Sequence, residues 1–326
     1  MSKNTNIISS NIKLVIEKWI NVKKGDNVLV VTDKNYQKEA DLLVDFAIAS
    51  GANAQTLVIA KTDKQAGVYF DENENIFDEY NIIIGATGYS LITTKATKRA
   101  IQKKSRYLSI PLKTNTGKSL FEYDFFKMDT NETKKMGTTL VKNLCYAKKI
   151  EIKTDKGTEL TIYKRNRIAD YFNGKFEDRQ SLSSASLEVY IPIEETMTNG
   201  TIVVDGSCGY IGKVEEDFSI KLSEGKIIEI DDSKSGEIFA RYLNSFDDTN
   251  MAFAGELGIG LNKLSKCIGN SYIEDESTYK TFHIGFGRNI GLGGVHDATA
   301  HFDIVVYHPN IYADGKLIIK KGEIIF

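Results

Sequence analysis

The chain has few of the features that mark secreted, membrane-bound or nucleic-acid-binding proteins. Its 326 residues carry 42 lysines and arginines against 44 aspartates and glutamates. This near balance gives no electrostatic reason to expect a nucleic-acid partner. No apolar run approaches the roughly 18 residues of a membrane span, and the N-terminus lacks the continuous apolar segment of a signal peptide. We therefore expect a cytoplasmic protein with neither a membrane nor a nucleic-acid partner.

Cysteine is scarce, and several familiar motifs are missing. Cys145, Cys208 and Cys267 are far apart and form no C-x-x-C pair, which excludes a disulfide framework or a thiolate zinc site. We expect all three to be small buried residues. The first predicted strand is followed by "VTDKNYQ" instead of G-x-G-x-x-G, so the common dinucleotide site is not expected. No G-x-S-x-G elbow occurs, and no cysteine stands near a histidine in a recognisable pattern.

The N-terminal part alternates short apolar runs with amphipathic segments. Apolar runs bounded by polar residues predict buried strands, and the segments with a 3.6-residue period predict helices. This rhythm favours parallel pairing in a doubly wound sheet. We therefore predict a Rossmann-like α/β domain over residues 1–148, with strands at "NVLVVT", "AQTLVIA", "YNIIIGAT" and "RYLSIP".

Beyond residue 148 the pattern changes to short strands and polar turns. "KIEIKTDKGTELTIYK" predicts a hairpin around Gly157, and the last residues predict turns at Gly315 and Gly322. One helix is expected over "SKSGEIFARYLNSF". We therefore predict a second, β-rich α+β domain over residues 149–326.

Ionisable residues stand in strands of this second domain where apolar residues are usual. In "AHFDIVVYHP", His301 and Asp303 share one face of the predicted strand, because side chains alternate between faces. A shared face can offer a nitrogen and a carboxylate to one metal ion. A solvent-exposed face, or a simple His–Asp pair, is the alternative that this motif leaves open.

Three further stretches carry similar groups. They are "IPIEET" with Glu194 and Glu195, "AGELGIGLN" with Glu256, and "TFHIGFGRN" with His283. A carboxylate among glycines and leucines is costly to bury unless it is paired. Carboxylates and imidazoles without thiolates suit two divalent ions such as zinc, cobalt, manganese or magnesium.

These motifs carry a family resemblance. The second domain resembles the aminopeptidase T (M29) family of metallopeptidases. The resemblance rests on motifs that occur in the same order as in that family: "PIEET…GTIVVDGS", "AGELGIGLN", "EDES", "HIGFGRN…GG" and "HFD…P…ADG". The resemblance covers mainly residues 185–326. It implies a homodimer that removes N-terminal residues from short peptides with a pair of metal ions. It also implies five metal ligands: Glu195, Glu256, His283, His301 and Asp303.

The resemblance further assigns roles within this site. Glu256 would bridge the two ions, and Glu276 in the acidic motif would act as a general base or support a ligand, unless "EDES" is simply a solvated turn. The chain departs from the family at Ile290, where the peptidases carry a tyrosine. This departure bears on the stabilisation of the transition state.

Two other functions remain open. His283, His301 and Asp303 also form the two-histidine, one-carboxylate set of non-heme iron(II) oxygenases. The dihydroxypyridine dioxygenases resemble this peptidase family and use such a set, so a ring-cleaving iron(II) dioxygenase is an alternative to the aminopeptidase. The two additional glutamates favour two metal ions over one. A catalytically inactive relative that binds metal or peptide is the third possibility.

Overall fold

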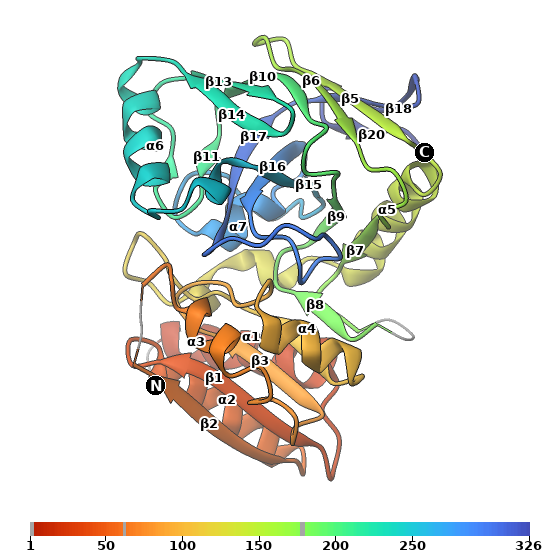
Figure 1. The fold of residues 1–326 in the computed structure, drawn as a ribbon. Helices are drawn as coiled ribbons and strands as arrows, with labels where there is room; N and C mark the ends of the chain where they lie inside the picture. Colours follow the sequence, from red (N-terminus) through yellow and green to blue (C-terminus); the bar gives the residue numbers. More distant parts are fainter. Residues whose placement is uncertain (1–2, 61–62, 177–179) are drawn as a thin grey trace. The chain divides into compact units, whose positions relative to one another are not determined.

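The computed structural model describes residues 3–60, 63–176 and 180–326. The chain forms two compact units, each built from two separate stretches of sequence (Figure 1). Unit 1 comprises Met1–Thr130 and Phe172–Ser186, and unit 2 comprises Asn131–Tyr171 and Leu187–Phe326.

This division differs from the single boundary expected between residues 148 and 149. Helix α5 (Thr130–Leu144) belongs to unit 2 from its second residue onward, because it packs closely on a neighbouring segment of that unit. A β-carbon at Gly137 of α5 would lie 2.6 Å from the ring of Tyr171. The chain then returns to unit 1 to add one more strand to its sheet.

Unit 1 is built on a five-stranded sheet whose described pairings are all parallel. The strand order is β2-β1-β3-β4-β8, so the sheet grows in both directions from β1. Such strands read as continuous apolar runs because helices cover both of their faces. This confirms the predicted doubly wound α/β arrangement. The strands are β1 (Asn27–Asp33), β2 (Asn53–Ile59), β3 (Ile82–Ala86), β4 (Arg106–Ser109) and β8 (Leu182–Ser184).

Helices lie on both faces of this sheet (Figure 1). The first helix, its π-helical continuation and α2 pack together, and α3 and α4 form a second pair. Thr94 caps α4 by accepting a hydrogen bond from the backbone N–H of Thr97 at 3.3 Å. The helical segments are α1 (Lys3–Leu14), η1 (Val15–Ile20), α2 (Gln37–Ala49), α3 (Gly67–Glu72), α4 (Lys95–Gln102), η2 (Leu120–Glu122) and η3 (Asp124–Lys127).

Unit 2 contains an eight-stranded sheet in the order β14-β13-β10-β6-β5-β18-β19-β20, with antiparallel described pairings. The predicted hairpins are confirmed, with left-handed glycines at Gly157, Gly315 and Gly322 in their turns. The strands are β5 (Lys149–Lys153), β6 (Glu159–Tyr163), β10 (Asn199–Val204), β13 (Phe218–Ser223), β14 (Lys226–Ile230), β18 (Asn310–Ala313), β19 (Lys316–Lys320) and β20 (Glu323–Ile324).

A second sheet of unit 2, with seven strands, has the order β12-β11-β17-β16-β15-β9-β7. Helix α7 packs on its three central strands. The predicted helix α6 begins after Ser233, whose side chain accepts a hydrogen bond from Gly236 N. The elements are β7 (Asp170–Phe172), β9 (Glu188–Pro192), β11 (Ser207–Cys208), β12 (Gly212–Lys213), α6 (Lys234–Asn244), η4 (Thr249–Ala252), β15 (Ala254–Gly260), α7 (Tyr272–Ser277), β16 (Thr281–Gly287) and β17 (His301–Tyr307).

The composition led to expectations about cysteine burial and about membrane-spanning segments. Cys208 and Cys267 are buried as expected, but Cys145 is exposed just after α5, so the expectation was wrong for that residue. Among the described residues, no helix is both long and apolar enough to cross a membrane.

Candidate metal centre

Four adjacent strands of the seven-stranded sheet bring ionisable side chains together. In sheet order, β17 supplies His301 and Asp303, β16 supplies His283, β15 supplies Glu256 and β9 supplies Glu188. The register is antiparallel throughout these four strands. The side chains therefore converge from a rigid scaffold and not from loops.

Glycines in these strands leave the room that the cluster occupies. A β-carbon on Gly258 would lie 1.8 Å from Nε2 of His283. A β-carbon on Gly285 would lie 2.5 Å from Cε1 of His301 and 2.7 Å from Oδ1 of Asp303. The glycines noted in the sequence around Glu256 and His283 thus have a steric function.

The cluster is held by short contacts between nitrogen and oxygen atoms. Nε2 of His301 lies 3.1 Å from Oε2 of Glu256 and 3.2 Å from Oδ1 of Asp303. Nε2 of His283 lies 2.9 Å from Oε2 of Glu188. None of these five side chains is more than 8% exposed.

The orientation of the His301 ring is fixed from its other side. Its Nδ1 lies 2.8 Å from the carbonyl oxygen of Arg288. Because a carbonyl only accepts hydrogen bonds, Nδ1 carries a proton and donates the hydrogen bond to this oxygen. Nε2 is thereby directed at Glu256 and Asp303, as in metal-binding histidines whose second nitrogen is fixed by a backbone carbonyl.

Helix α7 adds two groups to the cluster. The hydroxyl of Tyr272 donates a hydrogen bond to Oδ2 of Asp303. Glu276, one turn later on the same face, also hydrogen-bonds Asp303. The sequence motif "EDES" is therefore part of a buried helix, and the alternative of a solvated acidic turn was wrong.

The pKa values in the cluster reflect burial and mutual charge. Burial raises the pKa of Glu276 well above 4.5, and the nearby Glu188 and Asp303 carboxylates add to the effect. Burial opposes ionisation of Asp303 too, but the charges of His301 and His283 outweigh it and lower the pKa of this carboxyl. The carboxylates also outweigh burial at the histidines, raising the pKa of His283 to about 9 and that of His301 well above 6.5.

These groups suit a divalent cation. Two triads, Glu188–Glu256–His283 and Glu256–His301–Asp303, each offer three ligand atoms within 4.8 Å of one another, and they share Glu256. Carboxyl groups outnumber imidazoles in this buried cluster, and a metal ion would compensate the charge of the carboxylates that are ionised. Nδ1 of His283 is buried without a hydrogen-bond partner among the described residues, so this ring retains ligand capacity.

Most of the expected site residues meet in this cluster, but Glu195 does not. The structure brings together four of the five expected ligands, Glu256, His283, His301 and Asp303, and adds Glu276. The Glu195 carboxylate instead pairs with Arg167 and lies outside both triads.

Two residues of the cluster were not anticipated. Glu188 stands in "SLEVYIPI", where a carboxylate within an apolar strand was a usable signal. Tyr272 had no such signal, because a tyrosine beside an acidic motif is ordinary. Ile290, where the resemblance to the peptidases implied a tyrosine, follows Asn289 in the loop between β16 and β17.

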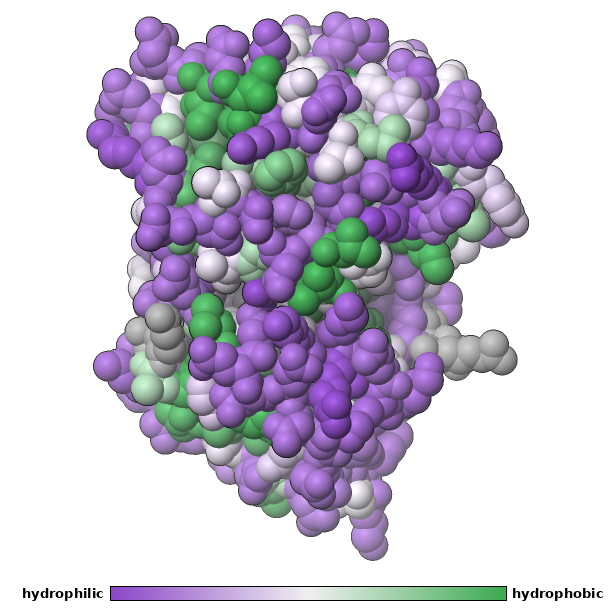
Figure 2. Space-filling model, in the orientation of Figure 1, coloured by the Kyte–Doolittle hydropathy of each residue, from purple (hydrophilic) through white to green (hydrophobic). Residues whose placement is uncertain are grey.

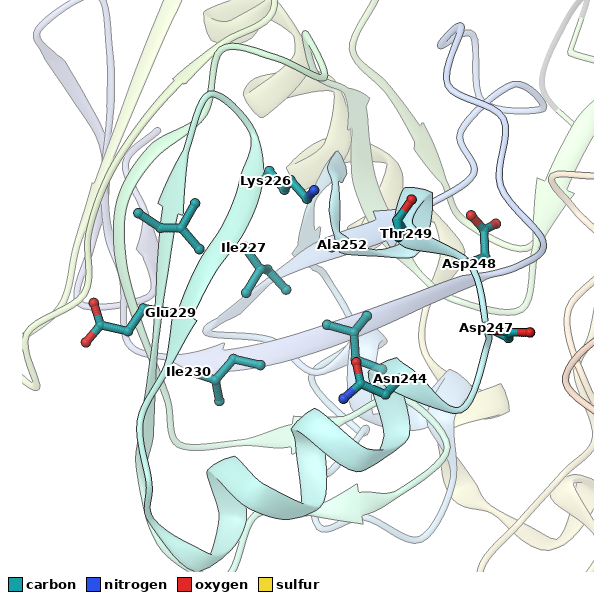
Figure 3. Close-up of a pocket in the computed structure, with 11 residues that line it drawn as sticks. Lys226, Ile227, Glu229, Ile230, Asn244, Asp247, Asp248, Thr249 and Ala252 are labelled. Atoms are coloured by element: carbon teal, nitrogen blue, oxygen red, sulfur yellow. The ribbon is translucent and has the colours of Figure 1, made fainter.

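A cavity of about 440 Å³ elsewhere in unit 2 is separate from this chemistry. It lies between β14, the end of α6 and η4, and its lining includes Ile227, Ile230 and Asp247 but none of the clustered residues (Figure 3). Figure 2 shows an apolar patch over the region of β13, β14 and α6, where Ile228 is 56% exposed. The buried cluster is therefore separate from this cavity.

Comparisons with known proteins agree with this architecture. The family model NicX, described as 2,5-dihydroxypyridine 5,6-dioxygenase, matches residues 15–326. The 2,5-dihydroxypyridine dioxygenase from Pseudomonas putida KT2440 superposes with a TM-score of 0.80 at 15% identity, over 100% of this chain and 98% of the other. Wild-type AmpT from Thermus thermophilus superposes with a TM-score of 0.68 at 14% identity, over 99% and 100%. No curated protein sequence matches the chain.

Proposed function

Because the chain belongs to the 2,5-dihydroxypyridine 5,6-dioxygenase family, we propose that it is an iron(II)-dependent dioxygenase that opens the ring of a dihydroxylated pyridine. The observation that carries the proposal is the family match, which spans residues 15–326 and so includes the entire buried cluster. The expected aminopeptidase function is less well supported. The chain shares its fold with AmpT, but the family match favours an oxygenase over a hydrolase.

We infer that the cluster holds a single iron(II) ion, because Glu256 belongs to both ligand triads and both histidines therefore lie close to one carboxylate. His283, His301 and Asp303 form the two-histidine, one-carboxylate set of non-heme iron oxygenases. The expected second metal ion rested on two additional glutamates, and one of them, Glu195, has Arg167 as its counter-ion. When bound, iron(II) supplies the redox chemistry with dioxygen that ring opening requires.

The other residues of the cluster orient these groups and hold protons. Tyr272 and Glu276 both hydrogen-bond Asp303, which fixes the orientation of its carboxylate. Burial and the neighbouring carboxylates raise the pKa of Glu276, which favours the protonated form of this acid. We therefore assign Glu276 the role of holding and returning a proton beside the substrate, and Glu256 that of an additional carboxylate at His301.

One observation favours a second candidate, the dinuclear aminopeptidase. Glu256 belongs to both triads, which is the arrangement expected of a carboxylate that bridges two ions. In this alternative, Glu188 would take the place that the sequence assigned to Glu195. Zinc, cobalt, manganese or magnesium would then occupy the two sites, and short peptides would be the substrates.

Anaerobic reconstitution followed by two assays distinguishes these functions. Metal-free protein is loaded with iron(II), and oxygen uptake is followed with 2,5-dihydroxypyridine. The same protein loaded with cobalt or zinc is assayed on aminoacyl-p-nitroanilides. The dioxygenase predicts one iron per chain and substrate-dependent oxygen uptake. Two ions per chain with peptidase activity would overturn it in favour of the alternative, and neither activity would identify an inactive relative.

A further inference from the structure

The carboxylate of Glu195 lies at the centre of a buried polar network beside the metal-binding cluster. One oxygen accepts hydrogen bonds from Nδ2 of Asn289 at 2.8 Å and from the backbone N–H of Val295 at 3.0 Å. The other lies 2.9 Å from Nη2 of Arg167. These partners outweigh the effect of burial and lower the pKa of Glu195, so the group is an anion.

Asn289 extends this network through the glycine-rich loop between β16 and β17. Its side-chain oxygen accepts from the backbone N–H of His296 at 3.0 Å, and its carbonyl accepts from Leu292 and Gly294. A β-carbon on Gly294 would lie 1.9 Å from Oδ1 of Asn289, so the loop wraps closely around this side chain. The amide of Asn289 and the carboxylate of Glu195 thus fix the loop from inside.

The loop begins at the residue that orients a metal-binding histidine. Arg288 precedes Asn289, and its carbonyl oxygen accepts the hydrogen bond from Nδ1 of His301. Its backbone N–H in turn donates to the carbonyl of Ala300 at 2.8 Å, which closes the base of the loop. The position of the Arg288 carbonyl therefore depends on how firmly Asn289 is held.

We propose that Glu195 is a positioning residue for His301, acting through Asn289 and the Arg288 carbonyl, and that it is not a metal ligand. The proposal rests on the metal site of the proposed function but not on the reaction that the site performs. Arg167 completes the network, because its second nitrogen donates to the carbonyl of Gly293 at 3.1 Å in the same loop. One ion pair thereby fastens the loop at two points, Gly293 and Val295.

Zinc binding to metal-free protein tests the proposal without requiring turnover. Calorimetry gives the affinity and stoichiometry of zinc binding. Because zinc is diamagnetic, proton NMR can report the Nδ1–H of His301, which is assigned by the loss of its signal in His301→Gln. The variants are Glu195→Ala and Glu195→Gln. Glu194→Ala is the matched control. Among the ion pairs of the described residues, the Glu194 side chain pairs only with Arg165, at 3.7 Å.

The expected result separates positioning from ligation. Glu195→Ala should weaken zinc binding about tenfold, as the loss of outer support for a metal ligand does, with unchanged stoichiometry. The Nδ1–H signal should broaden as water gains access to it. Glu195→Gln keeps an acceptor oxygen and should show a smaller effect, and Glu194→Ala should match the wild type.

Two results would overturn the proposal. A loss of one zinc equivalent in Glu195→Ala would make this residue a ligand, as the sequence resemblance implied. Unchanged affinity and an unchanged Nδ1–H signal, with only a lower unfolding temperature, would make it purely structural. Neither readout uses dioxygen or a pyridine substrate, so failure of the proposed reaction would leave this test intact.

Discussion

Adding one methyl group at Gly258 should empty the metal site while leaving the fold in place. Gly258 lies opposite His283 in the β15–β16 ladder. Its backbone has an ordinary negative φ, so alanine is compatible with the strand, and alanine is intrinsically favoured over glycine there by about 0.5–1 kcal/mol. The nearest obstacle is the imidazole of His283.

The size of the expected loss of activity follows from the space around Gly258. The added β-carbon would lie 1.8 Å from Nε2 of His283. Non-bonded atoms settle at about 3.5 Å, so the ring must move by well over 1 Å. Metal and catalytic groups tolerate only about 0.5 Å, and a displacement of about 1 Å can cost roughly 100-fold in rate. We therefore expect at least about a 100-fold loss of activity, with overpacking lowering stability by only about 1–3 kcal/mol.

The assay compares iron(II) content and oxygen uptake of Gly258→Ala with those of Gly67→Ala. Gly67 also has an ordinary backbone, and a β-carbon there would meet only a methyl group of Thr94, at 3.2 Å. Gly67→Ala should retain both properties, and urea unfolding should show both variants folded. If Gly258→Ala binds iron as tightly as the wild type, His283 does not bind the metal from its position opposite Gly258.

Three further predictions concern single side chains. Asp303→Asn should lower kcat/KM at least about 100-fold, whereas Asp297→Asn should have a much smaller effect, because the Asp297 side chain is 54% exposed and is linked to the site only through its ion pair with Arg288; equal losses would contradict the cluster. His296→Ala should leave metal content intact, because its Nε2 contacts the carbonyl of Asn250 at 2.9 Å and not the cluster; loss of metal would show it to be a ligand. Burial raises the pKa of Asp275 to about 7, so folding above that pH buries a charge. The wild type should therefore lose up to about 4 kcal/mol relative to Asp275→Asn between about pH 4 and pH 7. Urea unfolding at pH 5 and pH 8 should capture roughly 3 kcal/mol of this loss, and parallel profiles would refute it.

Local patterns were sufficient for most of the individual elements. The apolar run of Ile82–Ala86 and the turn glycine at Gly157 are signals contained within a few residues, so both elements were predicted. The return of Leu182–Ser184 to the first sheet was not. That strand has two serines and one leucine, and only its pairing with β4, more than 70 residues earlier in the chain, identifies it.

The same distinction applies to the site. Glu256, His283 and Asp303 were identifiable because a charge or imidazole in an apolar strand needs a partner nearby. The environment of Glu195 was not, because its partners Arg167 and Asn289 are 28 and 94 residues away in the sequence. Adjacent glutamates in "IPIEET" are indistinguishable until those partners are placed.

The return of the chain through β8 has a consequence for the order in which the protein folds during synthesis. Chains leave the ribosome from the N-terminus at roughly 5–20 residues per second. Every strand of the first sheet has been made once Ser184 has emerged, whereas the ladder of the second unit that carries His301 needs Tyr307. The first unit can therefore complete its sheet while the metal-binding strands are still being translated. A nascent chain halted at residue 148 would lack β8 and leave the edge of β4 unpaired, and so open to association with other chains.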